Sequence, residues 1–519
     1  MNTEVTKTQN HAAGIVQTLG KITLSNGVSI KESMLVSGIS LWEVAEPTIA
    51  LHIVPFLLKS DSGNLGLKDR LVLYIKWFRQ KARNFSFLTS SEDNSIRSER
   101  KSKWFFLVFS EYMYRDVLKP VIECIHRTSE EFEPIIIRSS TGIVQGKESF
   151  SVFRYRKKSN YLDFQKLKYS IRKVVKDFKG KGLDDVYVQQ NDLSKQQLDY
   201  LFKWLFLVFI PQFIPVLVVA QRLFGTGKPQ IIITCNIADP RSRIYCLFGR
   251  NYGIPILELQ FGHYGTDSVE WRFTLADKVA TWGEHFERLL ANFYGIPRHK
   301  LESIGSPRFD YIKTISKESF LKLCKENKMF AEGNKLILFA SSYTIPGYDQ
   351  VFSPDILNSF KERLFEISGG IDNLILLVKP HPVENPQRMK DAAHRYKNIF
   401  FIDPLHDIRE YIPFCDGFIT LGSTATYDAL LADKVIISPN MKNLVWWEDI
   451  FIEQNVSICV NDYEQLEHVF LDMVANDTKN LSLIKNNVKE FIKEAIHKPD
   501  GKASERVVQL ARNMINVSV

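Results

Sequence analysis

The stretch Ile375-Leu376-Leu377-Val378-Lys379-Pro380-His381-Pro382 decides how the second half of the chain is read. Four consecutive apolar residues followed by a proline-flanked corner predict a buried parallel strand that ends in a stiff turn. A second apolar run, Phe418-Ile419-Thr420-Leu421, ends in the small hydroxyl-rich loop Gly422-Ser423-Thr424-Ala425-Thr426. Because ligands of open parallel sheets bind outside the carboxyl ends of the strands, we expect both loops to face one ligand, for which an anion such as a phosphate is suited.

Short apolar runs alternate with helical patterns on either side of this pair. They lie at 231–235, 254–259, 279–282 and 301–304, and then at 336–340, 399–402, 435–437 and 458–460. This alternation predicts an α/β protein with two doubly wound, Rossmann-like domains in series and a cleft between them. We expect residues 1–228 to form an irregular, membrane-facing part of the first domain and 229–315 its remainder. Residues 316–490 form the second domain, and 491–519 a C-terminal helix that crosses back to the first.

Composition excludes several classes of protein. The chain has 519 residues, of which 45% are hydrophobic and 24% charged, an ordinary globular balance. Its net charge of +8 is spread along the sequence without an arginine-rich tract or zinc-finger spacing, so we expect no nucleic-acid partner. Six scattered cysteines without a CxxC pair predict free thiols in a reducing compartment. The polar start, Met1–Asn10, lacks a signal-peptide core, and we therefore expect a cytoplasmic protein.

Two segments raise the question of a membrane. Residues 68–103 are rich in lysine, arginine and aromatic residues, which is typical of a solvated helix face or of a patch resting on an anionic membrane. Residues 201–224 form the most apolar stretch, but Pro211, Pro215 and Lys203 interrupt it. A spanning helix is therefore disfavoured, and a buried helix or a monotopic membrane face remains. We expect peripheral attachment at the inner face of the cell membrane.

The candidate donor-binding residues all follow predicted strands of the second domain. Hydroxyl groups, backbone amides and a positioned imidazole can hold a nucleotide phosphate without a metal, so we expect neither a metal site nor a cofactor beyond the donor substrate. The ordinary alternatives are a polar turn after the first strand and a helix cap in the hydroxyl-rich loop. The candidates are Ser341, Ser342, Lys379, His381, Gly422, Ser423, Thr424 and Thr426.

The candidate base lies in the first domain. The loop Gln260–Asp267 follows a strand and contains two glycines, and His263 within it titrates near neutral pH. We therefore expect His263 to take a proton from an acceptor hydroxyl, with Asp267 and Glu270 as the reserve candidates. The alternative is a structural histidine in a turn. Gly305-Ser306-Pro307-Arg308-Phe309-Asp310 ends another strand and either lines the cleft or only turns into the connecting helix.

These motifs resemble those of the GT-B glycosyltransferase-like families that build bacterial surface polysaccharides. The resemblance covers residues 229–515 and is closest to capsule and lipopolysaccharide transferases with CMP-activated acidic sugars and to CDP-glycerol glycerophosphotransferases. It implies that His381-Pro382 and Ser423-Thr424 bind the donor's nucleotide phosphate and that the loop Gln260–Gly265 supplies the base. The glycerophosphotransferases usually show His-Gly-Thr where this chain has His263-Tyr264-Gly265-Thr266, which leaves the donor open.

The function that this implies is a metal-independent glycosyltransferase. It would move a sugar, or a sugar-like polyol phosphate, from a CMP- or CDP-linked donor to a growing, lipid-linked surface glycan. One rival is a non-hydrolysing nucleotide-sugar 2-epimerase, which shares the fold and needs no acceptor. The other is a catalytically silent GT-B-like binding subunit of a larger assembly.

Overall fold

The structure is a computed structural model, and it describes most of the chain. The described residues are 3–58, 102–128, 131–138, 149–151, 160–177, 183–189, 192–236, 238–311, 318–326, 333–343, 353–382, 384–442, 444, 449–477 and 481–517. The basic stretch 68–103 lies outside them, apart from its last two residues.

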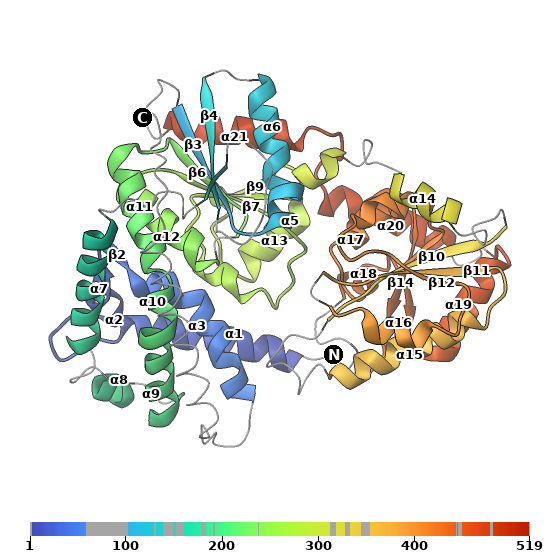
Figure 1. The fold of residues 1–519 in the computed structure, drawn as a ribbon, viewed down its shortest axis with the longest axis horizontal. Coiled ribbons are helices and arrows are strands. Elements are labelled where there is room, and N and C mark those ends of the chain that lie inside the picture. The colour runs from blue at the N-terminus through green and yellow to red at the C-terminus, as the bar shows by residue number, and fades with distance from the viewer. Residues whose placement is uncertain are drawn as a thin grey trace.

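Two parallel sheets form the centres of two domains (Figure 1). The first sheet has the order β5-β4-β3-β6-β7-β8-β9, with β3 Ser102–Val108, β4 Phe132–Arg138, β5 Ser149–Ser151, β6 Ile231–Thr234, β7 Ile256–Leu259, β8 Lys278–Thr281 and β9 Leu301–Ser303. The second has the order β12-β11-β10-β13-β14-β15, with β10 Lys335–Ala340, β11 Leu374–Lys379, β12 Ile399–Phe401, β13 Gly417–Ile419, β14 Val435–Pro439 and β15 Ile458–Val460. Every pair in both sheets is parallel, which is the GT-B arrangement of two Rossmann-like domains.

Helices cover the faces of both sheets. In the first domain they are α1 Thr3–Lys21, α2 Ile30–Ser33, α3 Leu41–Leu58, α5 Glu111–Met113, α6 Lys119–Thr128, α7 Asn160–Asp177, α8 Leu183–Gln189, α9 Lys195–Trp204, α10 Ile210–Gln212, α11 Ile214–Thr226, α12 Pro240–Asn251 and α13 Glu284–Asn292. A short hairpin, β1 Leu35–Val36 with β2 Ile39–Ser40, lies beside them. The helices that follow are α14 Glu318–Glu326, α15 Pro354–Gly369, α16 Gln387–Ala393, α17 Ala425–Leu431, α18 Ile450–Glu453, α19 Tyr463–Val474, α20 Leu481–Ala495 and α21 Ala503–Val517.

The first domain is more regular than its sequence indicates. Residues before 229, which we expected to be irregular, supply three of the seven strands of its sheet, and β4 and β5 were not predicted at all. The apolar run of β4 is short because Glu133 and Pro134 precede Ile135. Strand β5 is three residues long with a serine at each end, so neither strand shows the continuous apolar pattern of a buried parallel strand.

The apolar stretch 201–224 is folded into the first domain. It forms α9, a π-helical turn at Leu205–Phe209, α10 and α11, and Leu217, Val219 and Ala220 are fully buried. The chain bends by 50° between Gln212 and Ile214. No single helix among the described residues is long and apolar enough to cross a membrane, although the bent pair 195–212 and 214–225 meets that criterion when its halves are taken together.

The last helix of the chain packs on the first domain (Figure 1). Helix α21 lies beside α6, and Val507, Leu510 and Ala511 join the core beneath the first sheet. Asp310 caps this helix by accepting hydrogen bonds from the backbone N–H groups of Ala503 at 2.9 Å and Ser504 at 2.8 Å. The chain therefore connects the two domains a second time after the 316–335 segment.

Candidate active site

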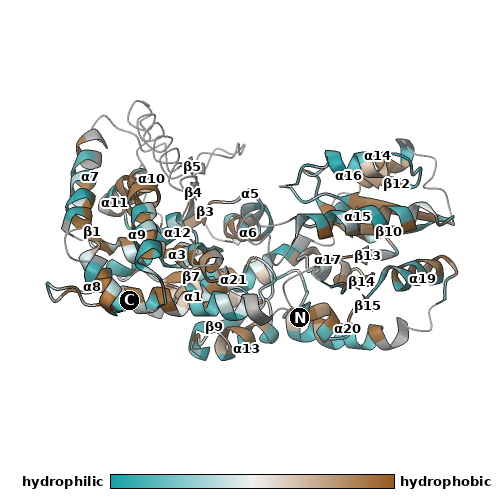
Figure 2. Ribbon diagram, turned by 90° about the horizontal axis from the view of Figure 1, so that it is seen from below, coloured by the Kyte–Doolittle hydropathy of each residue, from teal (hydrophilic) through white to brown (hydrophobic). Residues whose placement is uncertain are grey.

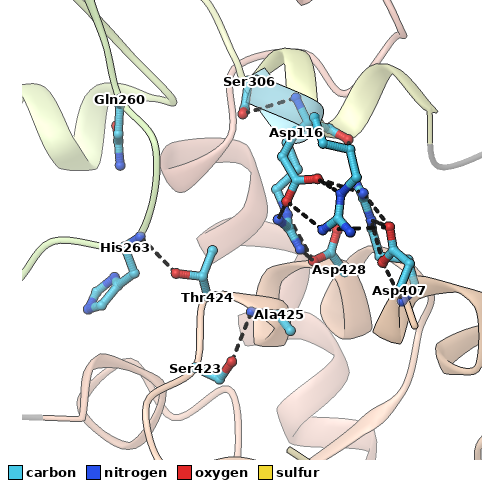
Figure 3. Close-up of polar contacts among 12 residues, drawn as sticks. Asp116, Gln260, His263, Ser306, Asp407, Ser423, Thr424, Ala425 and Asp428 are labelled. Atoms are coloured by element: carbon cyan, nitrogen blue, oxygen red, sulfur yellow. Dashed lines mark hydrogen bonds and ion pairs between the residues drawn. The ribbon is translucent and has the colours of Figure 1, made fainter. Parts of the chain in front are cut away.

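The loop after β7 and the loop before α17 meet at the boundary between the domains (Figure 3). The backbone N–H of His263 donates to the Oγ1 of Thr424 at 3.2 Å. A Cβ on Gly262 would lie only 3.2 Å from the same oxygen, so this position favours glycine. The histidine-bearing loop of the first predicted domain and the hydroxyl-rich loop of the second are thus in direct contact.

The imidazole of His263 also faces the second domain. Its Nδ1 lies 3.0 Å from the hydroxyl oxygen of Tyr427 on α17, and the side chain is half-buried. Burial, with a smaller effect of the nearby His285, lowers the pKa of His263 to about 4. The ring is therefore neutral at pH 7, and its pKa lies well below the range that suits a general base at that pH.

The carboxyl group of Glu270, in the segment that follows this loop, has a pKa that is raised instead of lowered. Burial, with a smaller contribution from the charge of Asp267, raises the pKa of Glu270 to about 7. The loop that carries both is held by Tyr294, whose hydroxyl donates to the carbonyl of Gly265 at 2.6 Å and accepts from the N–H of Ser268 at 2.8 Å. Of the two candidate bases His263 and Glu270, Glu270 has the pKa closer to neutral pH.

The residues of the hydroxyl-rich loop have two different roles. The Oγ of Ser423 accepts from the N–H of Ala425 at 3.3 Å, and Gly422 has φ +76°, a left-handed conformation that favours glycine. Ser423 and Thr424 are partly exposed. Thr426, which we expected to bind phosphate, is instead fully buried, and its hydroxyl donates to Thr420 at 2.8 Å. The helical turn that begins at Ala425 directs the side chain of Thr426 into the protein, so Thr426 stabilises the loop from the interior.

The candidates after β10 and β11 lie around the proline-flanked corner. Lys379 is buried and donates to the carbonyl of Pro404 at 2.8 Å, and burial lowers the pKa of Lys379 to about 8. The His381 ring packs on Tyr343 with centroids 4.4 Å apart. Ser341 is buried, and its hydroxyl lies 3.7 Å from the sulfur of Met389.

An ion pair between Lys361 and Glu384 holds the proline-flanked corner in place. Lys361 bonds both the carbonyl of Ser342 at 2.8 Å and the carboxylate of Glu384 at 2.5 Å. The same carboxylate accepts from the N–H of His381 at 2.8 Å. The stiffness that the flanking prolines predict is therefore reinforced by a hydrogen-bond network, and the side chain of His381 is held half-buried beside Tyr343.

Sequence reasoning missed a buried cluster of charges between the domains (Figure 3). Arg308 pairs with Asp116 of the first domain and, at 2.6 Å, with Asp428 of α17. Arg409 bonds the other oxygen of Asp116 at 2.8 Å. The members are Arg115, Asp116, Arg308, Asp407, Arg409 and Asp428. The only sequence signal was Arg308 in the Gly305–Asp310 motif, which we expected to line the cleft or to form a turn.

The charges in this cluster compensate one another in part, since burial still raises the pKa of Asp428 in spite of its pairing with Arg308. Burial opposes ionisation of Arg308, but Asp428 and Asp116 hold the pKa of its guanidinium above the usual range. Likewise, burial opposes the charge of Asp116, and Arg308 and Arg115 hold the pKa of that carboxyl below its usual range. Among the described residues, no group of three or more histidine, cysteine, aspartate or glutamate side chains is arranged to hold a metal ion.

Comparison with known proteins places part of the chain in a family. The sequence profile described as CDP-Glycerol:Poly(glycerophosphate) glycerophosphotransferase matches residues 265–512. No curated protein sequence matches the chain.

Solved structures share the fold at low sequence identity. The co-structure of S. aureus MnaA with UDP is 12% identical, covers 80% of this chain and 97% of its own, and has a TM-score of 0.50. The UDP-GlcNAc 2-epimerase from Neisseria meningitidis bound to UDP-GlcNAc is 12% identical, with coverages of 79% and 100% and a TM-score of 0.49. The wall teichoic acid polymerase TagF is 12% identical, with coverages of 86% and 98% and a TM-score of 0.47.

At this identity, such likenesses show the fold alone. The GT-B prediction is confirmed by the two parallel sheets and by the match to the MnaA structure, whereas the choice between transferase and epimerase depends on the family profile. The expected resemblance to the glycerophosphotransferases is confirmed by that profile, and nothing supports the capsule and lipopolysaccharide alternatives. Residues 265–512 of this chain, a little under half of it, match the CDP-glycerol glycerophosphotransferase family.

Proposed function

We propose that the protein transfers a polyol phosphate, or a sugar, from a cytidine-nucleotide donor to a growing surface glycan. The observation that carries this proposal is the contact between the His263 loop of the first domain and Thr424 of the second. That contact brings a histidine and a set of hydroxyl and amide donors to one place, as a transfer between two bound substrates requires. The family profile, which spans residues 265–512, supports a nucleotide-linked donor.

The two domains divide the work in this proposal. Donor phosphates lie against Ser423, Thr424 and the His381 corner, where N–H and O–H groups stabilise charge that develops on the leaving nucleotide. The acceptor hydroxyl approaches from the first domain beside His263 and Glu270. We keep the expectation that the reaction needs no metal, and assays with and without a chelator test it.

A nucleotide panel tests the donor class first. CMP and CDP are expected to raise the melting temperature of the protein more than UDP or GDP, because a ligand that binds only the folded state stabilises it by mass action. Transfer is then measured with CDP-glycerol and a lipid-linked glycan acceptor, and product that appears only when both are present supports the proposal.

Two results would contradict it. Formation of the 2-epimer from UDP-N-acetylglucosamine without any acceptor would make the protein an epimerase. Undiminished glycan synthesis in cells that carry both His263→Ala and His381→Ala would make it a silent binding subunit.

We also propose that the first domain rests on an anionic membrane at the cytoplasmic side. Helix α7 lies at the end of this domain farthest from the second domain (Figures 1 and 2). Tyr169 and Leu162 on it are 72% and 64% exposed. They alternate at helical spacing with exposed basic residues in the stripe Leu162, Lys166, Tyr169, Lys173 and Lys176. Such a stripe suits a surface of anionic lipid headgroups.

Vesicle sedimentation tests this attachment. Lys166→Glu/Lys173→Glu is expected to weaken binding to phosphatidylglycerol vesicles, whereas Lys485→Glu/Lys489→Glu on the exposed face of α20 serves as the charge-matched control. Equal binding of both variants would contradict a role for α7.

A further inference from the structure

Tyr427 belongs to the second domain, but its ring is enclosed by side chains of both domains. It is fully buried on α17. Trp282 and Phe286 of the first domain lie 5.3 and 6.2 Å from its ring centroid. Phe451 and Phe491 of the second lie at 5.3 and 5.9 Å. This enclosure is apolar, so the phenolic hydroxyl has few groups to which it can bond.

Among the residues that the structure describes, the hydrogen-bond partner of the Tyr427 hydroxyl is the Nδ1 of His263, at 3.0 Å. A phenol can donate one hydrogen bond and also accept. If Nδ1 carried the hydrogen and donated, the O–H of Tyr427 would stay buried without an acceptor, which costs about 1–3 kcal/mol. If Tyr427 donates to Nδ1, the buried O–H is satisfied. The second arrangement is therefore favoured.

The ionisation states agree with that direction. Burial raises the pKa of Tyr427 well above its ordinary value, so the phenol keeps its hydrogen at working pH. Burial also keeps His263 uncharged at pH 7, so its ring carries one hydrogen. With Nδ1 occupied as an acceptor, that hydrogen lies on Nε2, the nitrogen for which the described residues provide no partner.

We propose that Tyr427 holds His263 as the tautomer with its hydrogen on Nε2, so that His263 donates a hydrogen bond to the transferred phosphate instead of taking a proton from the acceptor. This inference rests on the proposed function for the identity of the phosphate. Tyr427 is a positioning residue in it, because its hydroxyl touches His263 and not the substrate. In this proposal His263 is a hydrogen-bond donor and not the base.

The transfer step then balances without a proton change at His263. The acceptor oxygen bonds to the phosphorus that carries the polyol, and the bond from that phosphorus to the bridging oxygen breaks, which releases CMP. The hydroxyl proton goes to a carboxylate, for which Glu270 is the candidate. The Nε2–H of His263 stabilises negative charge on the phosphate oxygens, as preorganised donors do at other sites of developing charge.

The tautomer can be measured without any substrate. In protein labelled with [¹⁵N]histidine, the two ring nitrogens of a neutral histidine have distinct shifts for the protonated and unprotonated states. The signals of His263 among the 11 histidines are identified by their loss in His263→Gln. We expect a protonated Nε2 and an unprotonated Nδ1, and the reverse assignment would overturn the proposal.

Tyr427→Phe tests the link to the second domain. The variant keeps the ring in its aromatic surroundings but removes the hydroxyl, so we expect His263 to populate both tautomers and kcat to fall about 3- to 10-fold. A histidine spectrum identical to that of the unaltered protein would overturn the positioning role. Tyr411→Phe is the matched control, because Tyr411 makes a similar bond to Nδ1 of His406 at 2.9 Å outside the proposed site.

Conservative substitutions of His263 separate a donor from a base. Glutamine places an N–H near the position of Nε2, asparagine places its amide near that of Nδ1, and neither can act as a base. His263→Ala is expected to lower kcat by about 10²–10³-fold, as the loss of one preorganised donor does. His263→Gln should retain about tenfold more activity than the alanine and asparagine variants. Equal activity of all three would overturn the donor role.

Failure of this inference differs from failure of the proposed function. A protonated Nδ1 together with polyol phosphate transfer would leave the function standing and remove the tautomer argument. The expected tautomer without transfer from any cytidine donor would refute the function, and with it the phosphate as the partner of Nε2.

Discussion

Tyr427 and Asp428 are neighbours on α17, yet they enter two opposite kinds of interface between the domains. Tyr427 lies among aromatic rings beside His263, and no charged group of the described residues bonds to it. Asp428 lies in the cluster of three arginines and three aspartates and pairs with Arg308 (Figure 3). Both side chains are almost completely buried.

Equal burial has opposite consequences on the two sides. On the aromatic side no opposite charge in the described part of the chain offsets the cost of burial, so the histidine is neutral and the tyrosine keeps its hydrogen. On the charged side each arginine has carboxylate partners, so Arg308 keeps its charge in spite of burial. The comparison indicates that one side of α17 holds the domains together, whereas the other sets the protonation state of His263 in the proposed site.

Removing Arg308 should destabilise the cluster of arginines and aspartates between the domains. Arg308→Met leaves Asp116 and Asp428 buried without their shared partner, and we expect a loss of about 3–5 kcal/mol of stability, measured as a lower melting temperature. Arg288→Met is the control, because Arg288 makes an ion pair with Glu494 in which both side chains are about half exposed. An exposed pair contributes about 0–1 kcal/mol.

A second substitution sharpens this prediction. Arg308→Met/Asp428→Asn removes one of the stranded charges and should recover part of the lost stability. If Arg308→Met melts at the same temperature as Arg288→Met, the cluster does not hold the domains together and the comparison between the two sides of α17 fails.

Glu270 offers a third environment, in which a half-buried carboxyl lacks an arginine partner among the described contacts. If its carboxylate takes the acceptor proton, kcat/KM should rise as the pH passes through about 7, because only the ionised form accepts a proton. Glu270→Gln should remove this rise of kcat/KM with pH and lower kcat by about 10²-fold. A rise centred near pH 4 would instead point to His263 as the base.

Asp267→Asn is the control for this prediction. The charge of Asp267 raises the pKa of Glu270, so the variant should keep activity and shift the rise of kcat/KM to lower pH. If the pH profile of kcat/KM is not shifted in this variant, the rise near pH 7 is due to the titration of another group.

The same glutamate should affect stability with the opposite sign. Its pKa is higher in the folded protein, at about 7, than in the unfolded chain, so between pH 4.5 and 7 the folded state binds more protons and stability falls as the pH rises. Glu270→Gln removes this penalty. We expect it to be more stable than the unaltered protein at pH 8, by about 2–3 kcal/mol at most, and equally stable at pH 4.

The strands of the second domain could be predicted from the sequence nearly to the residue. Ile458–Val460 was predicted with the bounds that the structure shows, and the apolar run Ile375–Val378 lies within β11, which extends one residue further at each end. Parallel strands that are buried on both faces require continuous apolar runs, and those runs are visible without knowledge of the fold. Strands β4 and β5 lack such runs and were missed.

The loops of the site could be predicted, but not their partners. Loops at the carboxyl ends of parallel strands face ligands by topology, which was enough to single out His263, His381 and Thr424. The bond from His263 to Tyr427 spans 164 residues, and that from Arg308 to Asp428 spans 120. No local pattern encodes such a pairing, so the roles of these residues depend on the tertiary structure.

The smallest effect is expected where the aromatic side begins, at Thr424. Thr424→Val keeps the shape of the side chain but removes the oxygen that accepts from the N–H of His263, so the His263 loop loses one anchor. We expect kcat to fall less than about tenfold, in line with the net value of one hydrogen bond. Ser423→Ala is the matched comparison, because its Oγ bonds only within its own loop at Ala425. If the proposed geometry holds, Thr424→Val should broaden the His263 signals in the [¹⁵N]histidine spectrum and Ser423→Ala should not, whereas an equal response of both variants would place the effect in the donor loop rather than in the contact between the domains.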